Sequence, residues 1–304
     1  MTPLRPERGG GGKIGAEGDD ALRLGLVLCG EGACAACGVG VLKELWRRGL
    51  EPVAVCGMLA GAWPAALFCA GFDAEQMTQA TVQTQRAGKR LLLEGWLGRR
   101  RLLGGAQALC SGSAIRQLLL AQVGERMLVL SRRDGLFLCR TAKSGRRVIF
   151  ASQAYVQEPG AALVTQVSTG FAARAAMAAP PFLQPMTWLG SPLLAETDTA
   201  FACRQLMAMG VQRVLVVMPQ PSPQRDMDAL DLASARWHWQ EAGSLPENTA
   251  LLRVPMPAEV GALSLGRLLP CVEAGEQAAA AELDRALEAL GMARCRVLPF
   301  RRSV

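Results

Sequence analysis

The sequence predicts an α/β protein built on a doubly wound, mainly parallel sheet, and two observations carry this prediction. Short apolar runs alternate with amphipathic helical segments along most of the chain. Glycines mark the points where a predicted strand passes directly into a helix. We expect one large domain over residues 21–304, with its core at about 22–219 and a C-terminal extension of the same fold at about 220–304.

Two strand–turn–helix units open this domain. Leu22–Leu28 is an apolar run that ends at Cys29-Gly30, and the apolar spacing of Cys37–Arg48 then predicts a helix. Pro52–Cys56 predicts a second strand, and Gly61–Ala70 a second apolar helix. Two such units in succession are typical of a parallel sheet with crossover helices.

The middle of the chain is less regular. Asp73–Leu97 predicts a long helix, and Ser113–Val123 predicts another that Ser111 or Ser113 caps. Three short runs with turn signals between them, at Asp134-Gly135 and Ser144-Gly145, then predict a small hairpin region. These runs are Met127–Ser131, Leu136–Arg140 and Arg147–Ala151.

The alternation returns in the last third of the chain. Ser168 is placed to cap a helix over Thr169–Ala179, and a helix over Thr199–Met209 leads into the β-branched run Arg213–Met218, typical of a buried parallel strand. Further strand and helix patterns follow at Leu251–Val254, Glu276–Leu290 and Cys295–Pro299. They extend the same fold towards the C-terminus.

Charge and aromatic content restrict the classes of partner. The formal net charge is +7, and part of it lies in the runs Gly98-Arg99-Arg100-Arg101 and Gly145-Arg146-Arg147, which we interpret as solvated loops. Peripheral contact with an anionic membrane stays open. With one Tyr and no aromatic motif among the basic residues, nucleic-acid binding is not expected. The single histidine, His238, excludes His-rich metal sites and is interpreted as structural.

The cysteines and the N-terminus indicate a cytoplasmic protein. Ten scattered cysteines in a chain of this length are typical of a reducing compartment. Residues 1–20 are rich in glycine and charge, lack the apolar core of a secretory signal, and are expected to be disordered. No apolar run reaches the roughly 20 residues that a membrane-spanning helix needs.

A glycine-rich turn follows the first predicted strand, at Gly30-Glu31-Gly32 with Cys34 close behind. This stretch resembles the opening of patatin-like phospholipases, where such a turn forms the oxyanion hole for a tetrahedral acyl intermediate. Glu31 stands where the family has glycine, and Cys34 where it has a basic residue. A Glu31 carboxylate about 4 Å from an oxyanion would repel it by on the order of 4 kcal/mol at an effective dielectric of about 20. The alternative is that Glu31 points into solvent.

Two further motifs resemble the same family. Gly57-Met58-Leu59-Ala60-Gly61 matches its nucleophile elbow, G-x-S-x-G, with Leu59 at the serine position. Leu189-Gly190-Ser191 matches its Asp-Gly-Gly or Asp-Gly-Ala motif, with Leu189 at the position of the aspartate base. The resemblance covers about Leu22–Pro219 and, more weakly, the rest through Gly261-Ala262-Leu263 and Glu273-Ala274-Gly275. It implies a three-layer fold with a mainly parallel sheet and helices on both faces.

Three functions remain open at this point. The resemblance without its serine and aspartate favours a pseudoenzyme with a role in lipid or protein binding or in regulation. An acyl hydrolase with another nucleophile, such as Cys34, is the alternative. A thiol redox or metal site at Cys34 and Cys37, which form Cys-x-x-Cys at a predicted helix start, is the weaker alternative. No cofactor is expected.

Leu59 itself has two interpretations. In the first, the pocket has closed or partly closed around the leucine, because a strained elbow is useful only when it positions a nucleophile. In the second, the pocket stays open as an apolar groove for acyl chains. The sequence favours the first. Asp134-Gly135 matches the first two residues of the family's Asp-Gly-Gly or Asp-Gly-Ala motif, but its place between two apparent strands predicts a turn.

Overall fold

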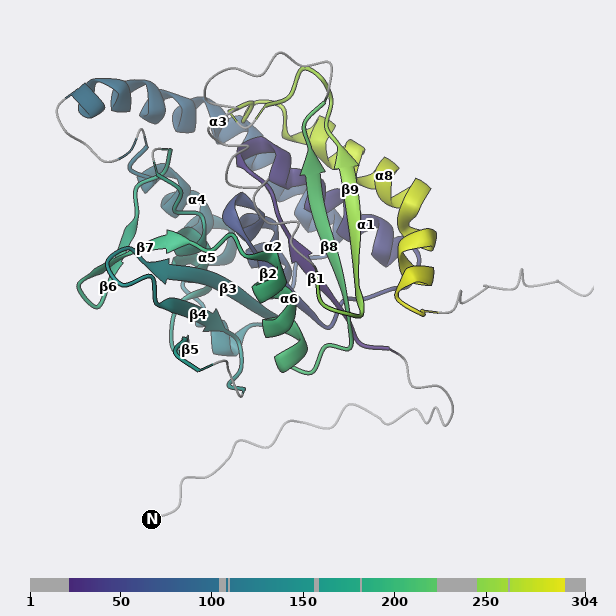
Figure 1. The fold of residues 1–304 in the computed structure, drawn as a ribbon. Helices are drawn as coiled ribbons and strands as arrows, with labels where there is room; N and C mark the ends of the chain where they lie inside the picture. The colour runs from purple at the N-terminus through teal and green to yellow at the C-terminus, as the bar shows by residue number, and fades with distance from the viewer. Residues whose placement is uncertain are drawn as a thin grey trace, which may run out of the picture.

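The chain has the predicted α/β fold, with one central sheet and helices on both faces. The computed structural model describes residues 22–103, 108, 110–155, 159–180, 182–222, 245–261 and 263–292. Nine strands within these ranges form one mixed sheet whose main path runs β5-β4-β3-β2-β1-β8-β9 (Figure 1). The expected N-terminal lead-in at 1–20, His238 and the run Cys295–Pro299 lie outside them.

Four parallel strands lie side by side in the sheet, in the order β2-β1-β8-β9. They are β1 (Leu24–Leu28), β2 (Ala54–Gly57), β8 (Arg213–Gln220) and β9 (Thr249–Pro255). The Leu28 end of β1 lies beside Gly57 of β2 on one side and Val217 of β8 on the other. All four strands lie where the apolar runs predicted them, which places the ends of β1 and β2 together at one edge.

Alternate side chains of β1 enter two different hydrophobic cores. Leu26 and Leu28 pack into the core formed with α1, α2, α5 and α8, whereas Val27 and Cys29 pack into the core formed with α6. Since successive side chains of a strand point to opposite faces, this pattern confirms that the sheet is covered on both sides. These helices are α1 (Cys37–Arg47), α2 (Ala62–Ala70), α5 (Thr169–Ala176), α6 (Thr199–Ala208) and α8 (Leu268–Ala289).

Two helices between α2 and β3 differ from the prediction in detail. The long helix α3 (Ala74–Leu103) continues through the arginine run at 99–101, so the interpretation of that run as a loop is wrong. Helix α4 (Ser113–Val123) has Gly112 as its N-cap, without a side-chain cap hydrogen bond. The Ser111 hydroxyl instead accepts from the Ser113 N–H at 3.3 Å. No helix in the described ranges is both long and apolar enough to cross a membrane.

The predicted hairpin region belongs to the central sheet. β3 (Asp134–Thr141) pairs parallel with β2 and antiparallel with β4 (Arg147–Ala151). Asp134-Gly135 begins β3 and is not a turn; a Cβ on Gly135 would lie 2.3 Å from the Cys69 sulfur, so close packing explains this glycine. The run at Met127 is also no strand, because it forms a 3₁₀ turn, η3 (Leu128–Leu130).

Three short strands complete the far side of the sheet. They are β5 (Ala162–Val164), β6 (Met186–Trp188) and β7 (Ser191–Ala195), which the sequence did not predict as strands. β6 and β7 form a hairpin, and β7 pairs with the end of β3. Ser168 caps α5 as predicted, since its hydroxyl accepts from the Phe171 N–H at 3.3 Å. Arg147 is no solvated loop residue, because it pairs with Glu196 and Asp198.

Candidate functional site

The turn between β2 and α2 has the tight geometry of a nucleophile elbow. Leu59 adopts φ +52°, a left-handed conformation that costs a leucine about 1–2 kcal/mol. A Cβ on Gly61 would lie 2.0 Å from the Leu28 carbonyl oxygen, and a Cβ on Gly57 would lie 2.5 Å from the Ala62 Cα. Both glycines are therefore required by the close passage of backbone, and the strained turn persists although a leucine occupies its apex.

The first glycine turn lies directly against this elbow. Gly30 has φ +141°, and its carbonyl accepts from the Ala60 N–H at 2.9 Å. The short helix η1 (Gly32–Ala36) begins after Glu31, and the Cys34 N–H donates to the Glu31 carbonyl within the turn. The structure thus brings together two of the three predicted motifs.

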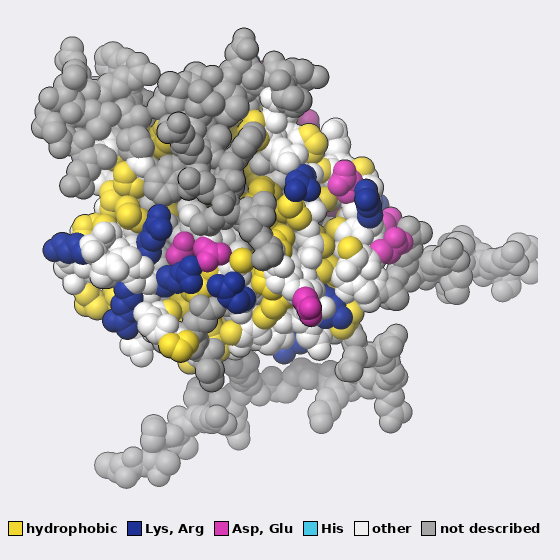
Figure 2. All heavy atoms as spheres, in the orientation of Figure 1, with side chains coloured by type: hydrophobic (Ala, Val, Ile, Leu, Met, Phe, Trp, Pro, Cys, Tyr) yellow, Lys and Arg dark blue, Asp and Glu magenta, His cyan; other side chains and the backbone are white. Residues whose placement is uncertain are grey.

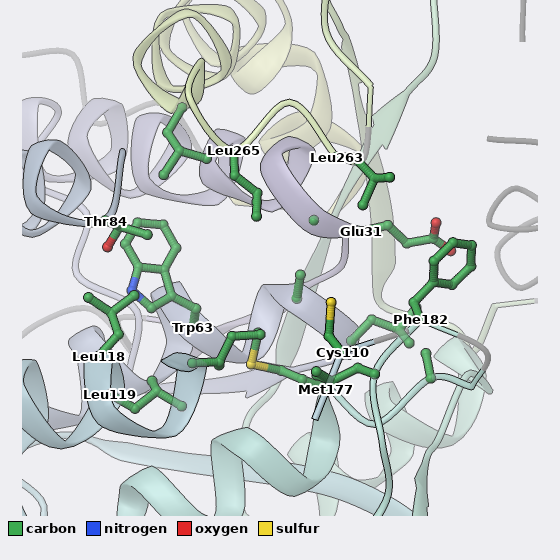
Figure 3. Close-up of a pocket in the computed structure, with 17 residues that line it drawn as sticks. Glu31, Trp63, Thr84, Cys110, Leu118, Leu119, Met177, Phe182, Leu263 and Leu265 are labelled. Atoms are coloured by element: carbon green, nitrogen blue, oxygen red, sulfur yellow. The ribbon is translucent and has the colours of Figure 1, made fainter. Parts of the chain in front are cut away.

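An open cavity of about 180 Å³ lies beside both turns (Figure 3). Leu59, Trp63, Leu119 and Phe182 contribute apolar side chains to its wall, which also includes Glu31. An engineered apolar cavity of about 150 Å³ holds a benzene molecule, so this one has room for a short alkyl chain or a small ring. The expectation was a pocket closed or partly closed around Leu59, and full closure is wrong, because Leu59 forms part of the wall of a cavity that remains open.

Comparison with protein families assigns the fold and the two turns to one family. The family described as patatin-like phospholipase matches residues 26–202, which is more than half of the chain. The chain belongs to this family. The matched range includes the glycine turn, the elbow and the Leu189 motif.

Solved structures similar to this patatin-like chain include VipD and the type III effector ExoU. VipD from Legionella pneumophila has 12% identity and a TM-score of 0.48, over 87% of this chain and 67% of VipD. The type III effector ExoU has 16% identity and a TM-score of 0.32, over 86% of this chain and 53% of ExoU. ExoU from Pseudomonas aeruginosa in complex with SpcU has 13% identity and a TM-score of 0.34, over 88% of this chain and 53% of that one. This chain therefore spans about half of the ExoU chains. A search of curated proteins finds no match.

The third family motif lies apart from the cavity. Leu189 and Gly190 form the turn between β6 and β7, and the Leu189 side chain is 82% exposed and does not line the cavity. Ser191 begins β7 and pairs with Trp188. Leu189 shares one property with Leu59, a left-handed backbone at φ +47°. Its equivalence to the family's base position stays a prediction from the sequence.

The polar groups in the cavity wall are few. The Thr84 hydroxyl donates to the Ala80 carbonyl and accepts from Gln122, so its hydrogen-bonding capacity is used inside the fold. The Cys110 thiol also lines the cavity, whereas Cys34 does not. Sequence reasoning missed Cys110 because no motif surrounds it; the segment reaches the cavity through backbone bonds with Phe182 and Gln184, far along the chain.

The second thiol of the Cys-x-x-Cys pair, Cys37, does not have the features of a reactive cysteine. Cys37 is fully buried, and burial raises the pKa of its thiol well above the usual value, opposite to the lowering expected at a helix start. Burial also raises the pKa of Cys29, to about 12. Within the described ranges no cluster of three or more Cys, His, Asp or Glu side chains is placed to hold a metal ion.

These pKa shifts predict selective protection of thiols. Because the thiolate is the reactive form, iodoacetamide at pH 8 is expected to leave Cys29 and Cys37 unlabelled in the native protein and to label both after unfolding. Peptide mapping by mass spectrometry measures this. Rapid labelling of Cys37 in the native protein would contradict the burial of its thiol and would favour a redox site at Cys34 and Cys37.

Proposed function

We propose that this patatin-like domain is a pseudoenzyme that binds an apolar ligand beside Leu59 without hydrolysing it. The observation that supports this most strongly is the elbow, which presents a hydrocarbon side chain to an open cavity. Removing the nucleophile of a triad hydrolase costs about a millionfold in turnover. A regulatory role in lipid metabolism, in the cytoplasm, is the setting we propose for this binding.

The wall of the cavity indicates the chemistry of the ligand. A preformed apolar cavity with few polar groups selects hydrocarbon, and each methylene that enters it contributes about 0.8 kcal/mol. Since Glu31 is part of the wall, neutral ligands are the suitable probes. The ligand class that fits is an alkyl or acyl chain.

Affinity is expected to rise with the length of a neutral alkyl ligand. Titration calorimetry with a series of straight-chain alcohols should show about a fourfold gain per methylene until the cavity is full, and then a plateau. The Leu118→Trp variant, which places an indole at the cavity wall, should lose this binding.

A matched control lies on the same helix. Leu120 is 46% exposed and does not line the cavity, so Leu120→Trp should bind the alcohols as the wild type does. Equal loss in both variants, or an affinity independent of chain length, would contradict binding in this cavity.

One observation favours a second candidate function, hydrolysis through a thiol. Cys110 lines the cavity, and a thiol is the most nucleophilic side chain available there. Under this alternative, pure protein would cleave a short acyl ester and Cys110→Ala would abolish the activity. Cys34, the residue expected for this role from the sequence, lies outside the cavity wall, so Cys34→Ala is the comparison.

A further inference from the structure

Two neighbouring turns form a projecting edge of the sheet, which we call the paired-turn tip (residues 141–146 and 188–191). The first joins β3 to β4, with the Gly145 N–H donating to the Thr141 carbonyl. The second joins β6 to β7. The Ala142 N–H donates to the Pro192 carbonyl at 2.8 Å, which holds the two turns side by side at the left of Figure 1.

Leu189 occupies the apex of the second turn, where the backbone is left-handed and a leucine is disfavoured. Leu189 and Gly190 have φ +47° and +75°, so this is a two-residue hairpin turn in which asparagine, aspartate or glycine is favoured at the first position. Leu189 is also 82% exposed, the largest exposure of any large hydrophobic side chain in the described ranges. Its side chain therefore contributes little to folding.

The surroundings of this leucine are basic. Residues 140–147 contain Arg140, Lys143, Arg146 and Arg147, and neither they nor residues 186–195 include an acidic residue. Arg147 is turned towards Glu196 and Asp198, and Arg140 lies in β3 before the tip. Lys143 and Arg146 are the exposed cations of the tip, and the Arg146 Nε–H donates to the Gly160 carbonyl at 3.1 Å. Figure 2 shows dark blue and yellow side chains together along the left edge, where Figure 1 places β6 and β7.

The turn also rests on a rigid base. The Trp188 ring packs edge-on against Phe150, with ring centroids 6.1 Å apart and an interplanar angle of 89°. Phe150 is fully buried in β4. This packing fixes the direction in which the hairpin projects, so the Leu189 side chain points into solvent and does not pack on the sheet.

We propose that the paired-turn tip binds the surface of an anionic lipid bilayer. Leu189 would enter the boundary between headgroups and acyl chains, while Lys143 and Arg146 contact lipid phosphates. An exposed apolar apex within a basic rim has the two weak signals that reversible membrane binding combines. A single apolar side chain is too small for the buried area of a stable protein interface. This proposal does not depend on what the cavity binds.

Vesicle cosedimentation tests this proposal with the full chain. Wild type is expected to sediment with phosphatidylcholine vesicles that contain phosphatidylserine, less so at high salt, and not with pure phosphatidylcholine. Leu189→Asn should lower the partition coefficient about tenfold. Because asparagine suits a left-handed backbone, this variant should unfold at the same urea concentration as wild type or at a higher one.

A charge-reversal variant tests whether the basic side chains of the tip contribute to vesicle binding. Lys143→Glu/Arg146→Glu should weaken partitioning by about a hundredfold or more. Arg253→Glu/Arg285→Glu makes the same change in net charge at exposed positions outside the tip and should have little effect. Equal losses in the two double variants, unchanged partitioning of Leu189→Asn, or no sedimentation of wild type with phosphatidylserine vesicles would each overturn the proposal.

Discussion

The double variant Leu59→Ser/Leu189→Asp is expected to hydrolyse acyl esters no faster than Leu59→Ser alone. β2 and β3 run parallel with Gly57 beside Phe137, and Leu193 of β7 lies beside Thr141, four residues further along β3. At about 3.3 Å per residue, Leu193 is already about 13 Å beyond the elbow along the sheet. Leu189 precedes β7, which runs antiparallel to β3, and so lies further away still.

A base must reach its nucleophile to activate it. A serine and its base need to approach to about 2.6–3.2 Å, and the hairpin turn holds position 189 well outside that range. Both variants should therefore remain about a millionfold below a working serine hydrolase. Initial rates with a soluble p-nitrophenyl ester measure this. A tenfold or larger gain on adding aspartate at position 189 would show that the hairpin folds over the elbow, contrary to the structure.

Gly40→Ala is expected to lower the free energy of unfolding by about 3 kcal/mol. Alanine inside a helix normally stabilises it by up to about 1 kcal/mol relative to glycine. Here α1 crosses α8 so closely that a Cβ on Gly40 would lie 2.0 Å from the Val272 carbonyl oxygen and 2.7 Å from the Glu276 nitrogen. Both contacts are with backbone, so one helix must move and the close packing of the core is lost.

The reciprocal contact and an open position provide the controls. A Cβ on Gly275 would lie 2.1 Å from the Cys37 carbonyl oxygen, so Gly275→Ala should destabilise similarly. No heavy atom lies within 4 Å of a Cβ built on Gly266, and Gly266→Ala should leave stability nearly unchanged. Urea denaturation measures all three. A Gly40→Ala protein as stable as Gly266→Ala would mean that the two helices do not cross this closely.

Local patterns predicted the central strands and the helices that cover them. The runs that became β1, β2 and β8 are continuous and apolar because both faces of these strands are largely buried, whereas β9 at the end of the sheet buries only alternate residues. The short strands β6 and β7 gave no such signal, because their side chains are mostly half-buried or exposed. Asp134-Gly135 has the sequence of a turn but begins a strand, because its glycine is needed for close packing against Cys69, which only the folded chain shows.

The candidate site could be predicted where it depends on local turns. Gly30 and Gly57 are fixed by close contacts within their own turns and Gly61 by the Leu28 carbonyl at the neighbouring strand end, and the spacing of these glycines is visible in the sequence. The open cavity could not be predicted, because its wall is assembled from segments as distant as Trp63, Cys110, Phe182 and Leu265. The separation of Leu189 from Leu59 likewise follows from the register of β7 on β3, which no local pattern encodes.

The most direct test of binding without hydrolysis uses one sample of pure wild-type protein with a medium-chain p-nitrophenyl ester. Native mass spectrometry follows the bound ester while absorbance follows the released p-nitrophenol. Intact ester bound to the protein, with release at the rate of buffer alone, is the predicted result. Release above the buffer rate, lost in Cys110→Ala or Cys34→Ala, would show a working thiol hydrolase and would contradict the assignment of a pseudoenzyme.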